Sequence, residues 1–198
     1  MNVEFTEKVD TKKEKKKTIL PDTKEKEEKK EFLHLLDEDQ VEVKKLDAED
    51  IEDAVKVMRK CSFEVTENEV GKIIEYGMSF GCYVNRMLVG VGLGWPAGFD
   101  PEKKIITGRN YNAIYLEDPA VLLMYEGRGI RRILLKEREK VASSKNFSYA
   151  IAYLYEDLPK GSIVEYIKEA GSQLEKLYLS EGYEFFKTER GVLAVKRL

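Results

Sequence analysis

Residues 120–135, AVLLMYEGRGIRRILL, constrain the fold of this chain more than any other stretch. A short apolar run leads into Gly127 and Gly129, and apolar residues at helical spacing follow directly. A strand, a glycine loop and a helix in this order can form an anion site, because free backbone N–H groups and the helix dipole converge there. Glycine suits positions where backbone must approach a phosphate or adopt a positive φ. A glycine pair is also common in ordinary turns, so the rest of the chain is needed to distinguish an anion site from a simple turn.

Three arginines flank the glycines and favour a polyphosphate ligand. They are Arg128, Arg131 and Arg132. A nucleotide-binding loop of the P-loop type is a weaker interpretation, because no G-K-[ST] follows the glycines to supply a phosphate lysine and a magnesium ligand.

The composition is that of one highly charged domain. The 198 residues are enough for a single core, with 42% hydrophobic and 36% charged residues. The net charge of -3 argues against non-specific nucleic-acid binding. No apolar run reaches the length of about 18 residues that a membrane span needs, and the first residues lack the apolar core of a signal peptide. We therefore expect no membrane partner, and nucleic-acid binding by the domain surface is disfavoured.

Cysteine and histidine usage limits the chemistry further. Cys61 and Cys82 lie far apart without metal-ligand spacing, and His34 is the single histidine. A disulfide framework and a multi-histidine metal site are therefore not expected, and a reduced, cytoplasmic setting fits. Ser-His or Cys-His catalysis would depend on His34, whose neighbourhood is rich in lysine.

The sequence predicts a charged N-terminal extension, residues 1–40, and a folded domain, residues 41–198. The extension has too few apolar residues to offset the entropy of ordering, so we expect it to be disordered or partly helical over residues 24–36. A solvated tail and a partner-binding or nucleic-acid arm both remain open for it.

Hydrophobic periodicity gives the order of elements in the domain. We expect a strand from Val41, a helix capped by Asp47 with Asp50, an exposed Phe63 in the next loop, and a helix from about Thr66. The remaining expected elements are a hairpin pairing residues 80–84 with 88–95, a long functional loop over 95–110, a strand over 113–122, the helix after Gly129, a strand over 147–155, helices over 163–169 and from 172 to Gly182, and two final strands around the turn 189–191.

This order resembles the GNAT superfamily of N-acetyltransferases. The segment YLEDPAVLLMYEGRGIRRILL is similar to the acetyl-CoA motif of the family, in which a strand leads through R/Q-x-x-G-x-G/A into a helix. The segment LYLSEGYEFF is similar to the closing helix of the family, and a hairpin feeds the motif strand in both. The resemblance covers residues 41–198. It implies an α+β fold with a mixed, mostly antiparallel six- to seven-stranded sheet flanked by about four helices.

The resemblance also implies a cofactor, acetyl-CoA, and no metal. The diphosphate of acetyl-CoA is expected to bind at residues 126–131, namely Glu126, Gly127, Arg128, Gly129, Ile130 and Arg131. Two positions depart from the family pattern: Glu126 stands where Arg or Gln is usual, and Arg131 where a second Gly or Ala is usual. Backbone N–H donors do not depend on side-chain identity, so the anion site can survive both changes. A third departure is Gly171, where the family often has Asn.

In the family, the motif strand parts from its neighbour at a bulge and its backbone holds the pantetheine arm. Pro119 fits such a break, since proline within a sheet is confined to ends, edges and bulges. Ala120 and Val121 would then offer the backbone donors. Tyr178 matches the family tyrosine that acts as general acid on the cofactor sulfur, although it could be a core aromatic. Glu117 is the candidate general base, with Asp118 less favoured and a simple polar strand residue as the alternative.

We therefore predict an N-acetyltransferase that moves an acetyl group from acetyl-CoA to a primary amine by direct attack in a ternary complex. A small amine, a peptide N-terminus and a lysine side chain all remain open as acceptors, and a homodimer is left open. The alternative is a catalytically weak or inactive acyl-CoA-binding module of the same fold that acts through a partner. Acidic residues could attract a cationic amine to the pocket mouth, or be ordinary surface charges; they are Glu64, Glu67, Glu69, Glu156 and Asp157.

Overall fold

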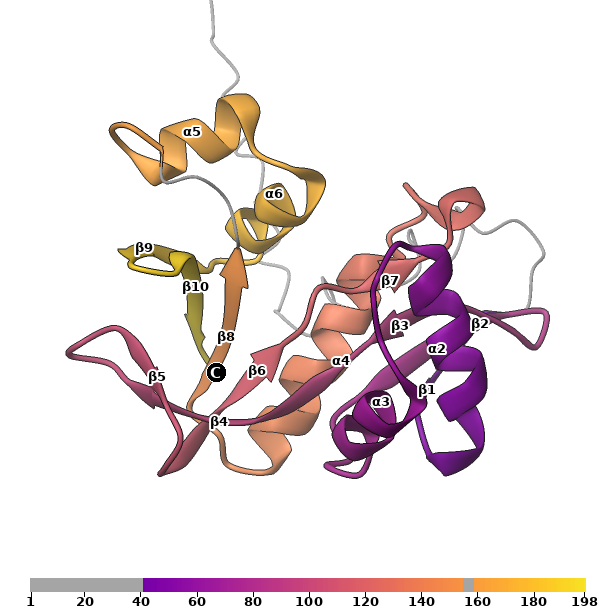
Figure 1. The fold of residues 1–198 in the computed structure, drawn as a ribbon. Coiled ribbons are helices and arrows are strands. Elements are labelled where there is room, and N and C mark those ends of the chain that lie inside the picture. The colour runs from indigo at the N-terminus through magenta and orange to yellow at the C-terminus, as the bar shows by residue number, and fades with distance from the viewer. Residues whose placement is uncertain (1–40, 155–158) are drawn as a thin grey trace, which may run out of the picture. The chain divides into compact units, whose positions relative to one another are not determined.

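The computed structural model describes residues 41–154 and 159–198, all within one compact unit, Leu36–Leu198 (Figure 1). The predicted extension, residues 1–40, lies outside the described residues, as do His34, Glu156 and Asp157. No helix in the described ranges is both long and apolar enough to cross a bilayer.

The strands form two sheets. The four-stranded sheet has the order β1-β2-β3-β7 and the six-stranded sheet the order β5-β4-β6-β8-β10-β9. Every strand pair is antiparallel except β6 with β8, so the predicted mixed, mostly antiparallel fold class is confirmed. The strands are β1 (Val41–Lys45), β2 (Phe80–Val84), β3 (Met87–Gly92), β4 (Gly94–Asp100), β5 (Ile105–Thr107), β6 (Tyr111–Leu116), β7 (Ala120–Val121), β8 (Tyr149–Leu154), β9 (Glu184–Thr188) and β10 (Gly191–Arg197).

The chain crosses between the two sheets twice. Leu93 alone separates β3 from β4, and residues 117–119 separate β6 from β7. The expected hairpin is therefore correct for β2 with β3, but Trp95 belongs to β4 and pairs with Tyr115 in the other sheet. The single strand expected over 113–122 is likewise broken, at the position of Pro119.

The long loop expected over 95–110 is wrong, because most of it forms the β4–β5 hairpin. Its Gly, Pro and Asp content suggested a loop, but these residues have places in the strands. Pro96 pairs with Ile114 on one side, and β5 begins to pair with β4 only at Gly98, so the other edge at Pro96 is open. Gly98 lies at a bulge where an added Cβ would be 1.9 Å from the carbonyl oxygen of Arg109, so only glycine fits.

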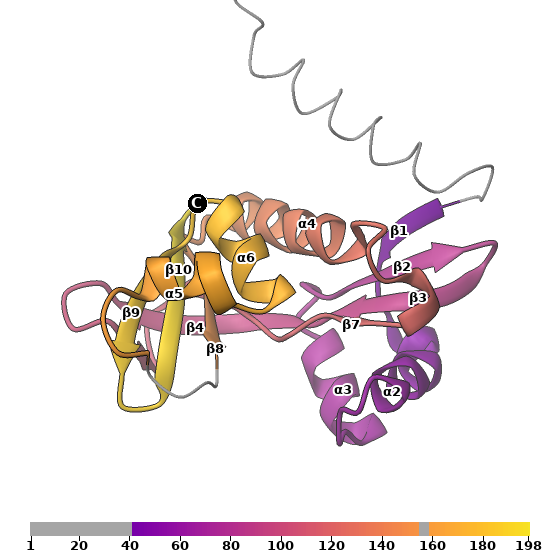
Figure 2. The same cartoon turned by 90° about the horizontal axis from the view of Figure 1, so that it is seen from above.

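Helices cover both faces of the four-stranded sheet. α2 (Ile51–Lys60) and α3 (Glu67–Ile74) pack on one face, and α4 (Ile130–Ser144) packs on the opposite face (Figure 2). Phe63, which was expected to be exposed, is partly buried against the α2–α3 side of this core. The short 3-10 turns η1 (Ala48–Asp50) and η2 (Leu123–Tyr125) precede α2 and the glycine loop.

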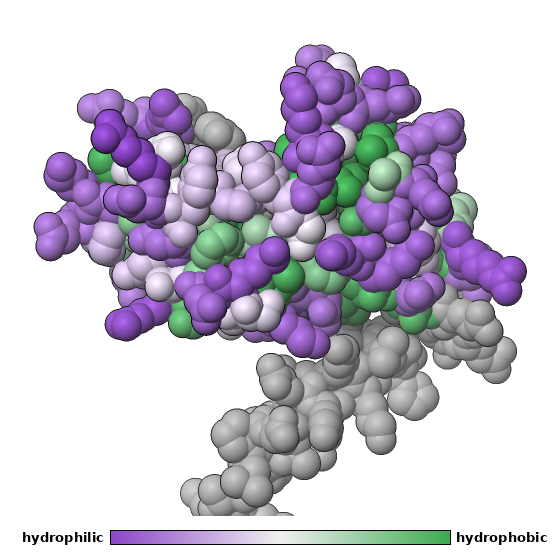
Figure 3. Space-filling model, turned by 90° about the horizontal axis from the view of Figure 1, so that it is seen from below, coloured by the Kyte–Doolittle hydropathy of each residue, from purple (hydrophilic) through white to green (hydrophobic). Residues whose placement is uncertain are grey.

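One face of the six-stranded sheet is covered by the second half of α4 together with α6 (Gln173–Ser180), while α5 (Ile163–Ala170) packs beside α6 and β9. The opposite face of this sheet carries an aromatic cluster, in which Trp95 stacks on Tyr115 with ring centroids 4.6 Å apart. Seen from below, hydrophilic side chains dominate the surface and hydrophobic ones form smaller patches between them, as expected from the charged composition (Figure 3).

Candidate functional site

The glycine loop leads into a helix N-terminus that no side chain caps. Gly127 and Gly129 have φ values of 74° and 75°, and Gly129 is the N-cap residue of α4. The other described helices are closed by side chains at Asp47 (through η1 into α2), Thr66, Ser162 and Ser172. The first N–H groups of α4 therefore lack the side-chain acceptor that each of these helices has, as an anion-binding site requires.

The two residues that depart from the family pattern pair with each other. The Arg131 guanidinium donates to both Glu126 carboxylate oxygens, at 2.5 and 3.2 Å, and its Nη1 donates to the Pro119 carbonyl at 2.9 Å. The Glu126 charge is thus matched by a partner within the loop. Arg131 also ties the start of α4 to the strand break.

The remaining two arginines of the expected cluster have different surroundings. Arg132 forms an ion pair with Glu181 at 2.9 Å and donates to Ser180 at 3.2 Å, which joins α4 to the end of α6. The Arg128 guanidinium lies 5.2 Å from the centre of the Tyr125 ring. Each of the three arginines therefore contacts a different set of neighbours.

The motif strand parts from its neighbour at the end of β6, before β7 and η2 lead into the glycine loop. β6 pairs with β8 in parallel only from Ala113 to Tyr115, after which β8 continues beside β10 while the chain of β6 crosses to the other sheet as β7 (Figure 1). Ala120 and Val121 pair with β3 on one edge, and no described strand pairs with their other edge, because β7 is the last strand of its sheet. The break near Pro119 is where the resemblance placed it, and the roles of Ala120 and Val121 toward the pantetheine arm stay predictions.

Sequence reasoning missed Arg138, a guanidinium buried at the strand break. Its Nη1 donates to the carbonyls of Leu93 and Glu117, at 2.7 and 2.8 Å, so it joins the two points where the chain crosses between sheets. Gly92 makes room for it, because an added Cβ would lie 3.0 Å from the Arg138 Nε. A signal was present: Arg138 continues the four-residue spacing of Ile130 and Leu134 on the buried stripe of α4.

Tyr178, the expected general acid, lies in the same buried region. It is fully buried, its ring packs edge-on against Tyr183 with centroids 4.7 Å apart, and its hydroxyl has no hydrogen-bond partner. Burial raises the pKa of Tyr178, and the positive charge of Arg138 opposes that shift. The phenol therefore stays protonated and available as a donor.

Glu117 and Asp118 also face this region, and both influence the pKa of Tyr178. Burial is the main cause that raises the pKa of Glu117, with the neighbouring Asp118 adding to it. Burial likewise raises the pKa of Asp118, against the lowering effect of Arg131 and Arg138. The preference for Glu117 over Asp118 stays a prediction, because the two carboxyls share similar surroundings.

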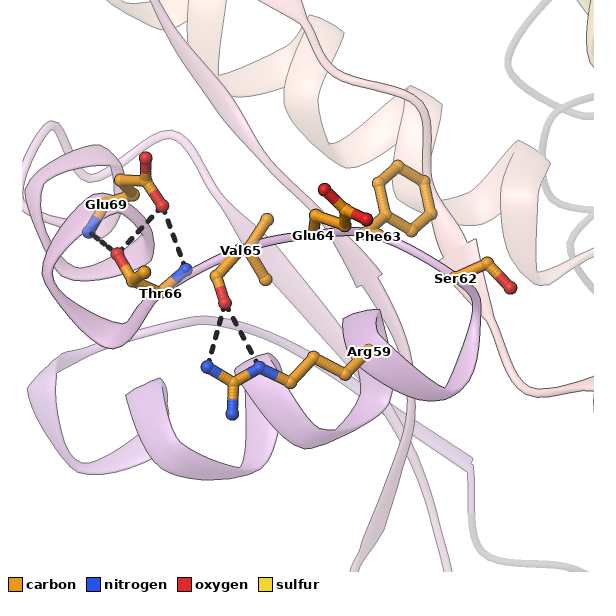
Figure 4. A pocket seen from close by; sticks show the side chains of 7 residues that line it. All are labelled: Arg59, Ser62, Phe63, Glu64, Val65, Thr66 and Glu69. Atoms are coloured by element: carbon orange, nitrogen blue, oxygen red, sulfur yellow. Dashed lines mark hydrogen bonds between the residues drawn. The ribbon is translucent and has the colours of Figure 1, made fainter.

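A shallow pocket of about 690 Å³ lies along the loop between α2 and α3 (Figure 4). The Arg59 guanidinium reaches from α2 to the Val65 carbonyl at 2.9 and 3.1 Å, while Thr66 and Glu69 form a capping box for α3. All the residues that line this pocket lie between positions 59 and 69. The Cys61 thiol donates to the Val121 carbonyl at 3.2 Å and connects this loop to β7.

Comparisons with known proteins bear on the fold. No protein-family model and no curated protein sequence match the chain. Solved structures do: a PaiA N-acetyltransferase from Thermoplasma acidophilum in complex with coenzyme A is similar at 17% identity and a TM-score of 0.58, over 80% of this chain and 99% of that one. The ribosomal-protein-S18-alanine N-acetyltransferase of Escherichia coli matches at 13% identity and a TM-score of 0.57, over 80% of this chain and 94% of that one.

A GNAT family acetyltransferase from Brucella melitensis in complex with acetyl-CoA matches at 14% identity and a TM-score of 0.53, over 80% of this chain and 88% of that one. At these identities the structural likeness shows the fold of the chain and does not show its activity. The open N-terminus of α4, the strand break and the element order all agree with the likeness. The described part of the chain has the fold of the GNAT acetyltransferases.

Proposed function

We propose that this protein is an acetyl-CoA-dependent N-acetyltransferase that acts on a primary amine by direct attack in a ternary complex. One observation carries the proposal: the N-terminus of α4 has a glycine in place of a side-chain cap, and β7 and η2 connect it to the strand break at residues 117–119. On this fold, the backbone at 127–131 would hold the diphosphate of the cofactor, and Ala120 and Val121 would hold its pantetheine arm.

Acetyl-CoA would supply the acetyl group as a thioester. Glu117 is assigned as the group that accepts a proton from the incoming ammonium, since burial raises its carboxyl pKa toward the range where a general base works best. Tyr178 is assigned as the O–H donor near the sulfur. Its burial keeps water away from the donor.

The acceptor is a primary amine, with a small amine, a peptide N-terminus and a lysine side chain as the candidates. The pocket between α2 and α3 is the proposed entry for it, because Cys61 links this loop to β7. Glu64 is exposed on the pocket wall and gives it a negative charge, which favours a cationic amine. Glu69 contributes less, since its carboxylate already accepts from Thr66.

A second function, a cofactor-binding module without catalysis, is favoured by one observation. Tyr178 has no exposed surface, so the proposed donor would have to be uncovered by the cofactor or by movement of α6. In such a module the cofactor would stabilise the fold, and a partner protein would bind the cofactor-bound form.

Thermal unfolding with and without acetyl-CoA tests both functions. A ligand that binds only the folded state stabilises it by RT ln(1 + [L]/Kd), or about 2.7 kcal/mol at a hundredfold excess over Kd. We expect a rise in Tm with acetyl-CoA and no rise with acetate, and no shift at millimolar acetyl-CoA would reject both functions.

Thiol release from acetyl-CoA across a panel of amines then separates the enzyme from the module. The enzyme should release thiol with at least one amine class. Tyr178→Phe should lower that turnover on the order of a hundredfold while leaving the acetyl-CoA-induced rise in Tm nearly intact. Unchanged turnover in this variant would remove Tyr178 from the mechanism, and a Tm shift without thiol release for any amine would favour the module.

A further inference from the structure

Two buried polar groups at the strand break have no partner among the described residues. The Arg138 Nη2 and the Tyr178 hydroxyl are both fully buried and neither has a hydrogen-bond partner. Buried donors are nearly always satisfied, because an unmet donor costs about 1–3 kcal/mol. Each of the two therefore points to an acceptor that binds there.

The Arg138 guanidinium is held rigidly from its other side. Its Nη1 donates to two carbonyls, its Nε donates to the Leu134 carbonyl at 3.1 Å, and Gly92 packs against it. Within the described ranges no carboxylate forms an ion pair with it, although burying an unpaired guanidinium is unfavourable. A fixed positive charge without a counter-ion favours an anion as the missing acceptor.

Tyr178 is the titratable group with the largest electrostatic effect on Arg138, and Arg138 has the largest on Tyr178. The other titratable groups around the pair are Glu117, Asp118, Tyr183 and Glu139. Glu139 is already engaged, since it accepts from Tyr183 at 2.8 Å and pairs with Lys196 at 3.0 Å. The charge of Arg138 acts to lower the carboxyl pKa of Glu117 and of Asp118. Within the described ranges neither carboxylate hydrogen-bonds the guanidinium, which binds Glu117 through its backbone carbonyl only.

We propose that Arg138 and Tyr178 form a sulfur-anion site, which holds the sulfur of bound coenzyme A as a thiolate. This inference rests on the proposed function and assigns to it a positioning residue that sequence reasoning did not find. On binding, the S–H bond of coenzyme A breaks, its electron pair stays on the sulfur, and the proton passes to the buffer. Tyr178 donates its hydrogen bond to the sulfur and keeps its proton, and the buried charge of Arg138 stabilises the negative charge on the sulfur.

The chemical consequence concerns the leaving group of acetyl transfer. When the amine nitrogen bonds to the acetyl carbon and the C–S bond breaks, the electron pair of that bond goes to the sulfur. A site that already stabilises anionic sulfur accepts this charge without prior protonation. Arg138 acts through its field and by fixing the strand break, so it is a positioning residue.

Calorimetric titration of the full-length protein with coenzyme A and with desulfo-coenzyme A tests the site without an acceptor amine. Each titration is run at pH 7 in two buffers that differ in ionisation enthalpy, which counts the protons released. We expect about one proton per coenzyme A, because a free thiol is mostly protonated at this pH. Desulfo-coenzyme A, which lacks the sulfur, should release none.

Variants locate the effect. Arg138→Met should abolish the proton release and weaken coenzyme A binding about tenfold or more, the size expected for loss of an adjacent opposite charge. Its affinity for desulfo-coenzyme A should fall by a clearly smaller factor, since that ligand responds only to the change at the strand break and has no sulfur to sense the charge. Lys140→Met removes a positive charge from an exposed position on the same helix and should change neither ligand.

A measurement on the unaltered protein covers the case in which Arg138→Met does not fold. If the thiolate is the bound form, the affinity for coenzyme A relative to desulfo-coenzyme A should rise about tenfold per pH unit below the free thiol pKa. A flat ratio, or proton release that persists in Arg138→Met, would overturn the sulfur-anion site. Failure of both ligands to bind would instead reject the proposed function itself.

Discussion

Arg131 and Arg138 lie on the same face of α4, seven residues apart, and both donate to a carbonyl of the strand break. Their surroundings differ. The Arg131 side chain is 29% exposed and is neutralised by Glu126, while Arg138 has no exposed surface and no ion-pair partner in the described part of the chain. Water can take the place of the Arg131 side chain at little cost in stability, whereas loss of Arg138 leaves the buried Glu117 carbonyl without its donor. The contribution of each arginine to stability therefore depends on its burial more than on its position along the helix.

The largest effect on stability is expected from Arg138→Met. The Glu117 carbonyl loses its buried donor, whereas the Leu93 carbonyl keeps the Glu117 N–H at 3.2 Å and loses its second hydrogen bond. With about 1–3 kcal/mol for the unmet carbonyl and about 1 kcal/mol for the lost second bond, we expect a loss of roughly 2–4 kcal/mol. Arg131→Met, the matched variant seven residues earlier on the same helix face, should lower the free energy of unfolding by about 1 kcal/mol or less. Urea denaturation of both variants measures this, and equal losses would break the comparison.

Gly92→Ala should come next, because it disturbs Arg138 without removing it. The new Cβ would lie 3.0 Å from the Nε and 3.2 Å from the Cζ of Arg138, so the guanidinium must shift. We expect a loss of about 1–3 kcal/mol in the free energy of unfolding. In an Arg138→Met background the same substitution should lose less, and a double-mutant cycle reports the coupling. Strict additivity would show that Gly92 is needed for another reason.

Glu126→Gln tests the partly exposed arginine, Arg131, by removing the charge of its ion-pair partner. It should change stability by less than about 1 kcal/mol, since the pair with Arg131 is partly solvated. On the proposed function it should also tighten acetyl-CoA binding about two- to fivefold at low salt, because a carboxylate near the diphosphate is removed. A calorimetric titration at low and high salt checks this. Weaker binding would mean that Glu126 positions Arg131 for the cofactor.

The smallest effect concerns the pH dependence of stability. Burial raises the pKa of Glu117 above its ordinary value of 4.5, so the folded chain holds this proton to a higher pH than the unfolded chain does. The group therefore favours folding at low pH, and this contribution is lost as pH rises from about 4.5 through the folded-state pKa. Glu117→Gln should flatten the stability profile over that window. A steeper profile would indicate that Arg138 dominates the carboxylate.

The sequence predicted the fold well where periodicity and capping residues are local. The helices after Asp47, Thr66 and Gly129 and the final two strands lie where expected. The division into two sheets was not predictable, because a continuous apolar run gives no sign that Leu93 ends one pairing and starts another. The β4–β5 hairpin was missed for a related reason: Pro96 and Gly98 are tolerated there only because of their sheet neighbours.

The site divides in the same way. The glycine loop and Pro119 could be located from residue type and order, since backbone conformation depends on both. The pairing of Glu126 with Arg131 was hard to predict, because Glu126 lies before the glycine loop and Arg131 lies in α4. No regular helix or strand spacing relates two residues on either side of a loop. Arg138 carried a signal as a charged residue on an apolar stripe. Its partners, Leu93 and Glu117, are distant in sequence and contribute backbone atoms, which no side-chain pattern reveals.

The double crossing of the chain between sheets has a consequence for how the protein unfolds. β3 and β4 are one run, and β6 and β7 are another, so each sheet holds strands whose chain continues into its neighbour. Neither sheet can fray along its whole length without pulling on the other. The described part of the chain should therefore lose both sheets in one cooperative transition, and slow amide exchange should be shared by strands on either side of Leu93.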